Sequence, residues 1–339
     1  MLATAPRYTE ILSAAPDAIA LKMGCVLDRP HPLAGELTLR KIAHAAGQKS
    51  RPQSGESDAS VVARGMGSSD FAKLLADGVG LATVAAYDAA SSEYLQVCSI
   101  LETKDFKQES TPALDGDLGL RLLKEFQPIE QVDVFTAAGG TAQLRTYGRL
   151  CIISRTTIFN DTLRALQTVF SGAGSNVAQL EASLLAQALN DNPTLDDGAA
   201  VFSAANSVAA ALADTSLGSA MALLRNEKNA AGNPLNLQAR HLLVDPGQEY
   251  AARKFVRDAA LNIEVCALAG LPSGRWFLLP SPAVHPVVGL LRLAGAKSPL
   301  RVKQERGFDV DGVLVLLTAD TGVSILRRSG IVRGGADLA

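Results

Sequence analysis

Residues 104–147 are the segment that most restricts what this chain can fold into. Turn signals interrupt the segment at Asp115–Gly116, Pro128 and Gly139–Gly140, and short apolar stretches lie between them. This pattern predicts an extended β-hairpin with irregular amphipathicity. A two-stranded hairpin is too small to bury an apolar face by itself. We therefore expect the segment to need a further surface to pack against.

Composition indicates a chain with a large core and little surface charge. The chain has 339 residues, of which 47% are apolar and 19% are charged. The charged share lies below the usual quarter, which suits large buried interfaces but also a large monomer with a thick core. The formal net charge is −2. A protein that grips nucleic acid by its phosphates normally carries a basic surplus, so we expect no tight binding to DNA.

Cysteine usage, hydropathy and the first residues exclude several other classes. The four cysteines are far apart and form no C-x-x-C pair, which argues against a zinc knuckle or a thioredoxin-like site. Isolated cysteines of this kind suit a reducing cytoplasm. The sequence has no apolar run of about 18 residues, so we expect no membrane span. Residues 1–25 lack the basic start and apolar stretch of a secretory signal.

Hydrophobic periodicity and turn residues predict an α+β order of elements. Helices are expected near Tyr8–Met23, Pro32–His44, 69–90, 160–192, Ser216–Asn229 and Gly247–Asp258. Strands are expected near Tyr94–Leu101, Leu144–Ile153, Arg240–Val244, Arg275–Leu279 and in Arg301–Val332, with turns at Gly307, Gly312 and Gly322. Residues 46–60 have a linker composition, so the first 60 residues are expected to form an arm outside the core. Gly172 and Gly174 predict a bend in the long helix.

Motifs of catalysis and metal binding are scarce. The sequence has no G-x-S-x-G, H-E-x-x-H or Walker motif. None of the four histidines has a cysteine or a second histidine at ligand spacing, so no metal and no cofactor is expected. Asp309–Gly312 and Asp115–Asp117 fit turns better than calcium loops, because the other calcium ligands are missing. A Ser/His/Asp triad stays possible, because its members need not be close in sequence.

Several short motifs occur together in an order that is typical of one family. They are Ser69-Asp70-Phe71 with Leu74-Leu75, Lys104-Asp105-Phe106-Lys107, Thr146-Tyr147-Gly148-Arg149, Ile158-Phe159-Asn160-Asp161, Asn192-Pro193, Gly232-Asn233-Pro234-Leu235, Trp276-Phe277-Leu278 and Arg306-Gly307-Phe308-Asp309. In this order the chain resembles the major capsid (head) proteins of tailed bacteriophages, specifically the Mu-like major head subunits that include fusions with a prohead protease. The resemblance covers residues 67–312.

The resemblance implies a Hong Kong 97-like capsid fold and a particular order of domains along the chain. It implies an N-terminal arm (1–66), a helix and strand leading into the body (67–103), an E-loop hairpin (104–147), a P-domain with a spine helix (148–195), an A-domain (196–300) and C-terminal P-domain strands (301–339). Another copy of the chain would then cover the hairpin, and rings of copies, as hexamers and pentamers, would tile an icosahedral shell.

The charged residues of the hairpin are candidates for contacts between subunits. The residues concerned are Lys104, Lys107, Arg121, Lys124, Glu125, Glu130 and Asp133. Sequence alone favours a solvated hairpin surface for them, where ion pairs contribute little. The functional interpretation is charge matching to a neighbouring subunit.

The resemblance further implies partners and leaves two alternatives open. A portal, a scaffold or prohead protease and decoration proteins would be partners, and the shell would enclose double-stranded DNA without sequence-specific binding. Such a protein is a virion component assembled in the host cytoplasm and is not an enzyme. The alternatives are an encapsulin-like nanocompartment with a protein cargo and an unrecognised α/β hydrolase.

Overall fold

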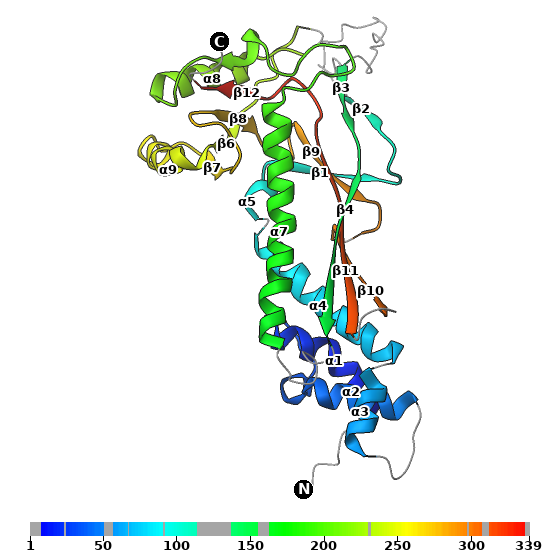
Figure 1. The fold of residues 1–339 in the computed structure, drawn as a ribbon. Helices are drawn as coiled ribbons and strands as arrows, with labels where there is room; N and C mark the ends of the chain where they lie inside the picture. The colour runs from blue at the N-terminus through cyan, green and yellow to red at the C-terminus, as the bar shows by residue number, and fades with distance from the viewer. Residues whose placement is uncertain are drawn as a thin grey trace, which may run out of the picture. The chain divides into compact units, whose positions relative to one another are not determined.

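The computed structural model describes residues 8–23, 25–50, 57–66, 68–90, 92–113, 137–154, 163–229, 232–296, 298–306 and 312–335. The chain divides into two compact units. Unit 1 comprises Met1–Ser91, Thr146–Gln179 and Lys297–Asp320, and unit 2 comprises Ser92–Arg145, Leu180–Ala296 and Thr321–Ala339. A long helix, α7 (Leu163–Asn190), and a long strand, β11 (Gly312–Ile325), contribute to both units (Figure 1).

Unit 1 combines a layer of helices with three strands. Its helices are α1 (Tyr8–Lys22), α2 (Leu39–Ser50), α3 (Asp58–Met66), α4 (Ser69–Ala90) and the first part of α7, with a short 3-10 helix η1 (Ala34–Glu36) before α2. Its strands are β4 (Arg145–Ser154), β10 (Leu300–Arg306) and the first part of β11. β11 pairs antiparallel with β10 and also pairs with β4. The helix expected at Pro32–His44 begins later, at Leu39, because the 3-10 turn occupies the residues before it.

The first 60 residues form part of the core of unit 1. Ile19 of α1 and Leu39 and Ile42 of α2 are fully buried, and they belong to one apolar cluster with Phe71 and Leu75 of α4. The expectation that these residues form an arm outside the core is therefore wrong for the part that the structure describes. The sequence misled because its amphipathic stretches are short, and only tertiary packing shows that α4 completes their core.

Within the linker expected at residues 46–60, both ends are helical, and residues 51–56 lie outside the described residues. α2 extends to Ser50 and α3 begins at Asp58. The two helices cross closely at glycines: a Cβ on Gly47 would overlap the Val61 carbonyl oxygen, and a Cβ on Gly65 would overlap the Ala43 carbonyl oxygen. Glycine in this segment therefore permits close helix packing, whereas its composition suggested a flexible linker.

The long helix α7 is continuous through Gly172 and Gly174, so these glycines do not break it. Gly174 faces α4 in unit 1, where an added Cβ would overlap the Thr83 carbonyl oxygen and would lie 2.9 Å from the Ala86 Cβ. The helix forms because its apolar residues recur at helical spacing, and Pro193 follows shortly after its end.

Unit 2 contains two sheets and a hairpin. Its strands are β1 (Cys98–Thr103), β2 (Glu109–Ala113), β3 (Ala137–Ala142), β5 (Ser207–Val208), β6 (Ala239–Val244), β7 (Glu264–Ala267), β8 (Trp276–Pro280), β9 (Val288–Leu293), β12 (Val332–Gly334) and the end of β11. Its helices are α5 (Ser92–Leu95), α8 (Asp214–Asn226), α9 (Glu249–Asp258), the end of α7 and two 3-10 turns, η2 (Ala204–Asn206) and η3 (Pro246–Gln248). The strand expected from Tyr94 starts at Cys98, because α5 precedes it.

The first sheet of unit 2 is mixed. β9 pairs parallel with β1, with Cys98 opposite Val288, and antiparallel with the end of β11, with Ile325 opposite Val288. Gly322 is not a turn residue as expected, since it pairs with Leu291 inside β11. A Cβ on Gly322 would overlap the Gln143 carbonyl oxygen, so glycine allows a close approach of two backbone segments.

The second sheet of unit 2 has the strand order β5-β12-β8-β6-β7. Trp276 and Leu278 of β8 and Leu242 of β6 share a core with α8 and α9, so both helices cover one face (Figure 1). Residues one position along point to the opposite face, where the Phe277 ring packs against Phe202 with 5.5 Å between ring centroids. Both units thus mix helices with sheet, and the expected α+β class is confirmed.

Candidate site of contact between subunits

The base of the β2–β3 hairpin is part of unit 2. The two strands are antiparallel, with Glu109 opposite Ala142 and Ala113 opposite Ala137, and the register shifts between Thr111 and Ala113. Gly139 and Gly140, expected as a turn, lie inside β3. The expected hairpin is thus confirmed at its base, although one of its turn signals belongs to a strand.

Backbone hydrogen bonds tie β3 to the body of unit 2. The Gly140 N–H donates to the Leu326 carbonyl at 3.0 Å, and the Asp196 N–H donates to the Gly139 carbonyl at 3.1 Å. The Ser324 hydroxyl donates to the Thr141 carbonyl at 2.8 Å. A side chain at residue 140 would overlap the Ile325 carbonyl oxygen, so only glycine fits there. The hairpin therefore starts from a base whose position is fixed.

The turn between β1 and β2 presents two of the candidate contact residues. The Lys107 N–H donates to Asp105 Oδ1 at 3.1 Å, and the Thr103 hydroxyl donates to the Asp105 carbonyl at 2.6 Å. Lys104 and Lys107 are exposed on this turn. Neither lysine has an ion pair with another residue that the structure describes. The other candidates lie outside the described residues: Arg121, Lys124, Glu125, Glu130 and Asp133.

Exposed apolar side chains occur in each of the two units, and sequence reasoning missed them. In unit 2, Ile100 of β1 is 62% exposed and Phe106 of the following turn is 43% exposed. In unit 1, Leu150 and Ile152, which lie on one side of β4, are 59% and 50% exposed. Exposed apolar residues that recur along a strand are typical of surfaces that another molecule covers. The two-residue spacing of Leu150 and Ile152 was the signal in the sequence.

The titratable groups of the described core do not form a catalytic centre of a familiar type. Burial raises the pKa of both Cys98 and Cys266 to about 12, so neither thiol is an activated nucleophile. His285 Nε2 lies 3.1 Å from the Ser329 hydroxyl, but its Nδ1 faces Arg327 Nη1 at 3.4 Å, where a triad would have a carboxylate. Among the described residues, no group of three or more His, Cys, Asp or Glu side chains could hold a metal ion.

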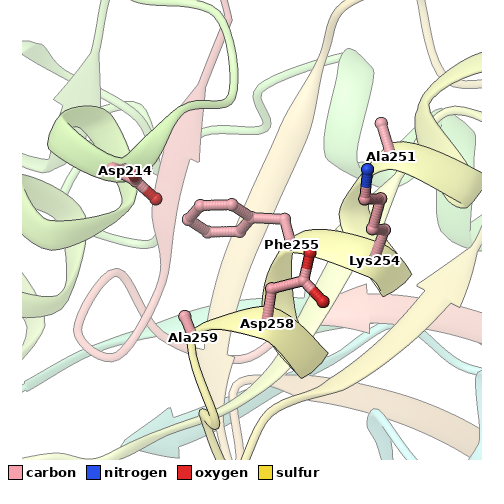
Figure 2. Close-up of a pocket in the computed structure, with 6 residues that line it drawn as sticks. All are labelled: Asp214, Ala251, Lys254, Phe255, Asp258 and Ala259. Atoms are coloured by element: carbon pink, nitrogen blue, oxygen red, sulfur yellow. The ribbon is translucent and has the colours of Figure 1, made fainter.

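A hollow of about 490 Å³ lies between α8 and α9 in unit 2. Figure 2 shows the Phe255 ring pointing from α9 toward Asp214 of α8, with Lys254 and Asp258 on the same helix. These charged side chains are exposed, and the hollow is open to solvent. The lining supplies neither an activated nucleophile nor an oriented base. Across the described ranges, no helix is both long and apolar enough to cross a membrane.

Comparison with known proteins shows which family and which solved structures this chain is similar to. A family model of phage capsid proteins matches residues 139–334, which is more than half of the chain. No curated protein sequence matches the chain. The structure is similar to the capsid of an empty GTA particle, with a TM-score of 0.50 and 12% identity over 72% of this chain and 89% of that chain.

Two further solved structures are similar at lower TM-scores. The Mycobacterium phage Bobi structure has a TM-score of 0.45 and 12% identity over 74% of this chain and 91% of that chain. The SrpI encapsulin of Synechococcus elongatus has a TM-score of 0.45 and 8% identity over 74% of this chain and 89% of that chain. From the match over residues 139–334 and the fold shared with the GTA capsid, the chain belongs to the phage capsid protein family and has the Hong Kong 97-like fold.

Proposed function

We propose that this chain is the major capsid protein of a tailed phage. Copies of it form hexamers and pentamers, which tile the icosahedral head around the double-stranded DNA genome. The observation that carries the proposal is the match to phage capsid proteins over residues 139–334. In this proposal the chain is a structural protein without enzymatic activity, present in the virion and assembled in the host cytoplasm. A portal, a prohead protease and decoration proteins are its proposed partners.

The proposed division of the chain follows the capsid fold. Residues 104–147 act as the E-loop, 148–195 contain the spine helix α7 of the P-domain, 196–300 form the A-domain, and 301–339 return strands to the P-domain. Residues 1–66 take the place of the N-terminal arm, but with helices that pack onto α4. Residues 67–103 lead from these helices into the body.

The described surfaces support a head-to-tail contact between copies. The hairpin base is fixed to unit 2, and Lys104, Lys107 and Phe106 are exposed on the turn that leads into it. A donor surface of this kind and a different acceptor surface produce heterologous contacts, which close into rings when the rotation per copy closes. The exposed Leu150 and Ile152 of β4 are candidates for the acceptor surface.

Negative-stain electron microscopy of the purified full chain tests this function. We expect closed shells that have one dominant diameter and that a size-exclusion column excludes. Shells purified from cells that also produce the other head proteins should protect double-stranded DNA from nuclease. Shells that contain a specific protein and no DNA would support an encapsulin-like compartment instead. A stable monomer at high protein concentration would contradict both.

A further inference from the structure

A buried carboxylate in unit 2 is contacted at both oxygens by three other side chains. Glu181 of α7 is fully buried. Arg292 of β9 approaches it as a fork, with Nη1 2.6 Å from Oε1 and Nη2 donating to Oε2 at 3.0 Å. The Thr321 hydroxyl of β11 donates to Oε1 at 2.7 Å, and the Tyr94 hydroxyl of α5 donates to Oε2 at 2.6 Å. Oε2 therefore accepts two hydrogen bonds, and Oε1 accepts one in addition to its close contact with the guanidinium.

The four residues Tyr94, Glu181, Arg292 and Thr321, here called the Glu181 cluster, are linked to one another as well as to the carboxylate. Arg292 Nη1 also donates to the Thr321 hydroxyl at 2.9 Å and to the Leu291 carbonyl at 3.2 Å. Thr321 thus both donates and accepts within the cluster. A shift of one residue moves a helix by about 1.5 Å and a strand by about 3.3 Å, so a slipped register would break most of these bonds at once.

The cluster lies where the chain enters and leaves unit 2. Glu181 is the second residue of the segment Leu180–Ala296 of unit 2. Thr321 is the first residue of the segment Thr321–Ala339. Tyr94 comes shortly after Ser92, and Arg292 comes shortly before Ala296. The cluster therefore joins all three chain segments of unit 2, and its four residues lie close to four of the points at which the chain passes between the units.

Energetics argue that this cluster does more than fill the core. Burial of two charges carries a desolvation cost, so a buried ion pair often stabilises a protein no more than apolar residues of similar size. Apolar residues such as Leu290 and Ile325 fill the remainder of this sheet. A bidentate, fully hydrogen-bonded pair, however, tolerates a single geometry, whereas apolar side chains slide and repack.

We propose that the Glu181 cluster is a register lock, which fixes α7 against α5, β9 and β11 so that unit 2 enters assembly as one body. The effect of the lock on assembled shells rests on the proposed function as a capsid protein. Its effect on the free subunit is independent of that function. Loss of the lock leaves a folded subunit whose unit 2 samples more than one register, and such subunits build shells of mixed curvature.

The buried thiol of Cys98 reports on the lock in the free subunit. Cys98 lies in β1 beside the cluster and is 6% exposed, whereas Cys25 lies in unit 1, where it is partly buried. In Glu181→Gln we expect pulse labelling of Cys98, measured by mass spectrometry, to accelerate about tenfold, because local opening becomes easier. Labelling of Cys25, in unit 1, should stay within about twofold of the parent chain.

A matched variant controls for the loss of a charge. Glu264→Gln removes the acid of the Arg240–Glu264 pair, which belongs to the same unit but has side chains 37% and 46% exposed. This variant should leave Cys98 labelling unchanged, because exposed pairs contribute little. Equal labelling of Cys98 in Glu181→Gln and the parent chain would overturn the lock.

An apolar variant tests whether the cluster fixes the register of unit 2 or only contributes to its thermal stability. It combines Glu181→Met, Arg292→Met, Tyr94→Phe and Thr321→Val, so that no polar group of the cluster is left unpaired. We expect a thermal unfolding midpoint at or above that of the parent chain, but shells of several diameters in electron micrographs. Uniform shells of parental diameter would show that the cluster only fills the core, and they would overturn the proposal. If this variant does not fold, Tyr94→Phe and Thr321→Val, tested singly, should each accelerate Cys98 labelling, and unchanged labelling in both would overturn the lock.

Failure of the parent chain to form shells would contradict the proposed function. The labelling of Cys98 in free subunits would still decide the lock. The two ideas therefore fail in different experiments.

Discussion

At the scale of single residues, the two glycines of α7 have opposite surroundings. Gly174 packs against the backbone of α4, where a Cβ would overlap the Thr83 carbonyl oxygen. Around Gly172, apart from its chain neighbours and the backbone of its own helix, no atom of the described residues lies within 4 Å of the position that a Cβ would take. Glycine is thus required at position 174, whereas at position 172 it only lowers the helix propensity of the chain.

Alanine at these two positions should therefore change stability in opposite directions. We expect Gly174→Ala to lower the free energy of unfolding by about 1–3 kcal/mol, because the packed helices must move apart. Gly172→Ala should raise it by about 0.5–1 kcal/mol, because alanine loses less backbone entropy in a helix. Urea unfolding of both variants measures the difference. Equal effects would show that α7 does not pack on α4 as described.

His285 gives unit 2 a pH dependence. Burial, followed by the neighbouring Arg327, lowers the pKa of His285 from its ordinary 6.5 to about 4. As the pH falls below about 6.5, the unfolded chain binds a proton that the folded chain refuses until about pH 4, so stability is lost across this window. Well above the ordinary pKa of 6.5 this residue contributes no pH dependence.

We expect the free energy of unfolding to fall by about 1–2 kcal/mol between pH 7 and pH 5 on account of this histidine, with allowance for its partial contact with water. Thermal unfolding at the two pH values measures the loss. His285→Gln, which cannot take up the proton, should show a smaller loss. The same pH dependence in both proteins would assign the effect to other groups.

At the scale of elements, we expect the β2–β3 base of the hairpin to fold without residues 114–136. Ala113 and Ala137 are cross-strand partners at the outer end of the described pairing. An Asn-Gly turn connects such a pair with two residues. Because β3 keeps its bonds to Leu326 and Ser324, replacement of residues 114–136 by Asn-Gly should leave the fold of unit 2 unchanged.

This shortened chain should be soluble and folded but should not form closed shells. Because the replaced segment is the proposed contact with a neighbouring copy, its loss removes a contact at every subunit. Size-exclusion chromatography and electron microscopy measure assembly, and the thermal unfolding midpoint serves as the control for folding. Normal shells from this variant would refute the proposed role of the hairpin.

At the scale of the whole molecule, charge is nearly balanced, with 32 basic and 34 acidic residues. Nonspecific DNA binding draws its strength from cations that displace the counterions of phosphates. A chain without a basic surplus can enclose a genome without holding it, which suits packaging and release. Three arginines also form ion pairs with carboxylates of the fold: Arg292, Arg301 and Arg328.

We therefore expect the free subunit to bind double-stranded DNA weakly, with a dissociation constant above about 10⁻⁴ M at physiological salt. Fluorescence anisotropy of a labelled duplex, titrated at about 50 and 150 mM salt, measures both the affinity and its salt dependence. A steep loss of affinity with salt would reveal a local basic surface and would contradict a role limited to enclosure.

Local sequence determined much of the fold. The helices α4, α7, α8 and α9 and the strands β4, β6 and β8 form close to where periodicity and turn residues predict them, because each carries enough apolar residues at its own spacing. The order of the short motifs identified the family, which the match over residues 139–334 bears out. The hairpin at residue 104 onward was also expected, and the register of β2 and β3 confirms its base.

Only the tertiary structure decided which glycines permit close packing and where the first 60 residues belong. Gly47, Gly140, Gly174 and Gly322 were interpreted as linker, turn or bend, because a glycine has the same local signature whether it bends the chain or admits a neighbouring backbone. The Glu181 cluster could not be predicted for a related reason: its members come from the four elements α5, α7, β9 and β11, and their hydrogen bonds form only where these elements meet. Sequence specifies propensities along the chain, whereas contacts between distant segments depend on the three-dimensional packing that those propensities jointly produce.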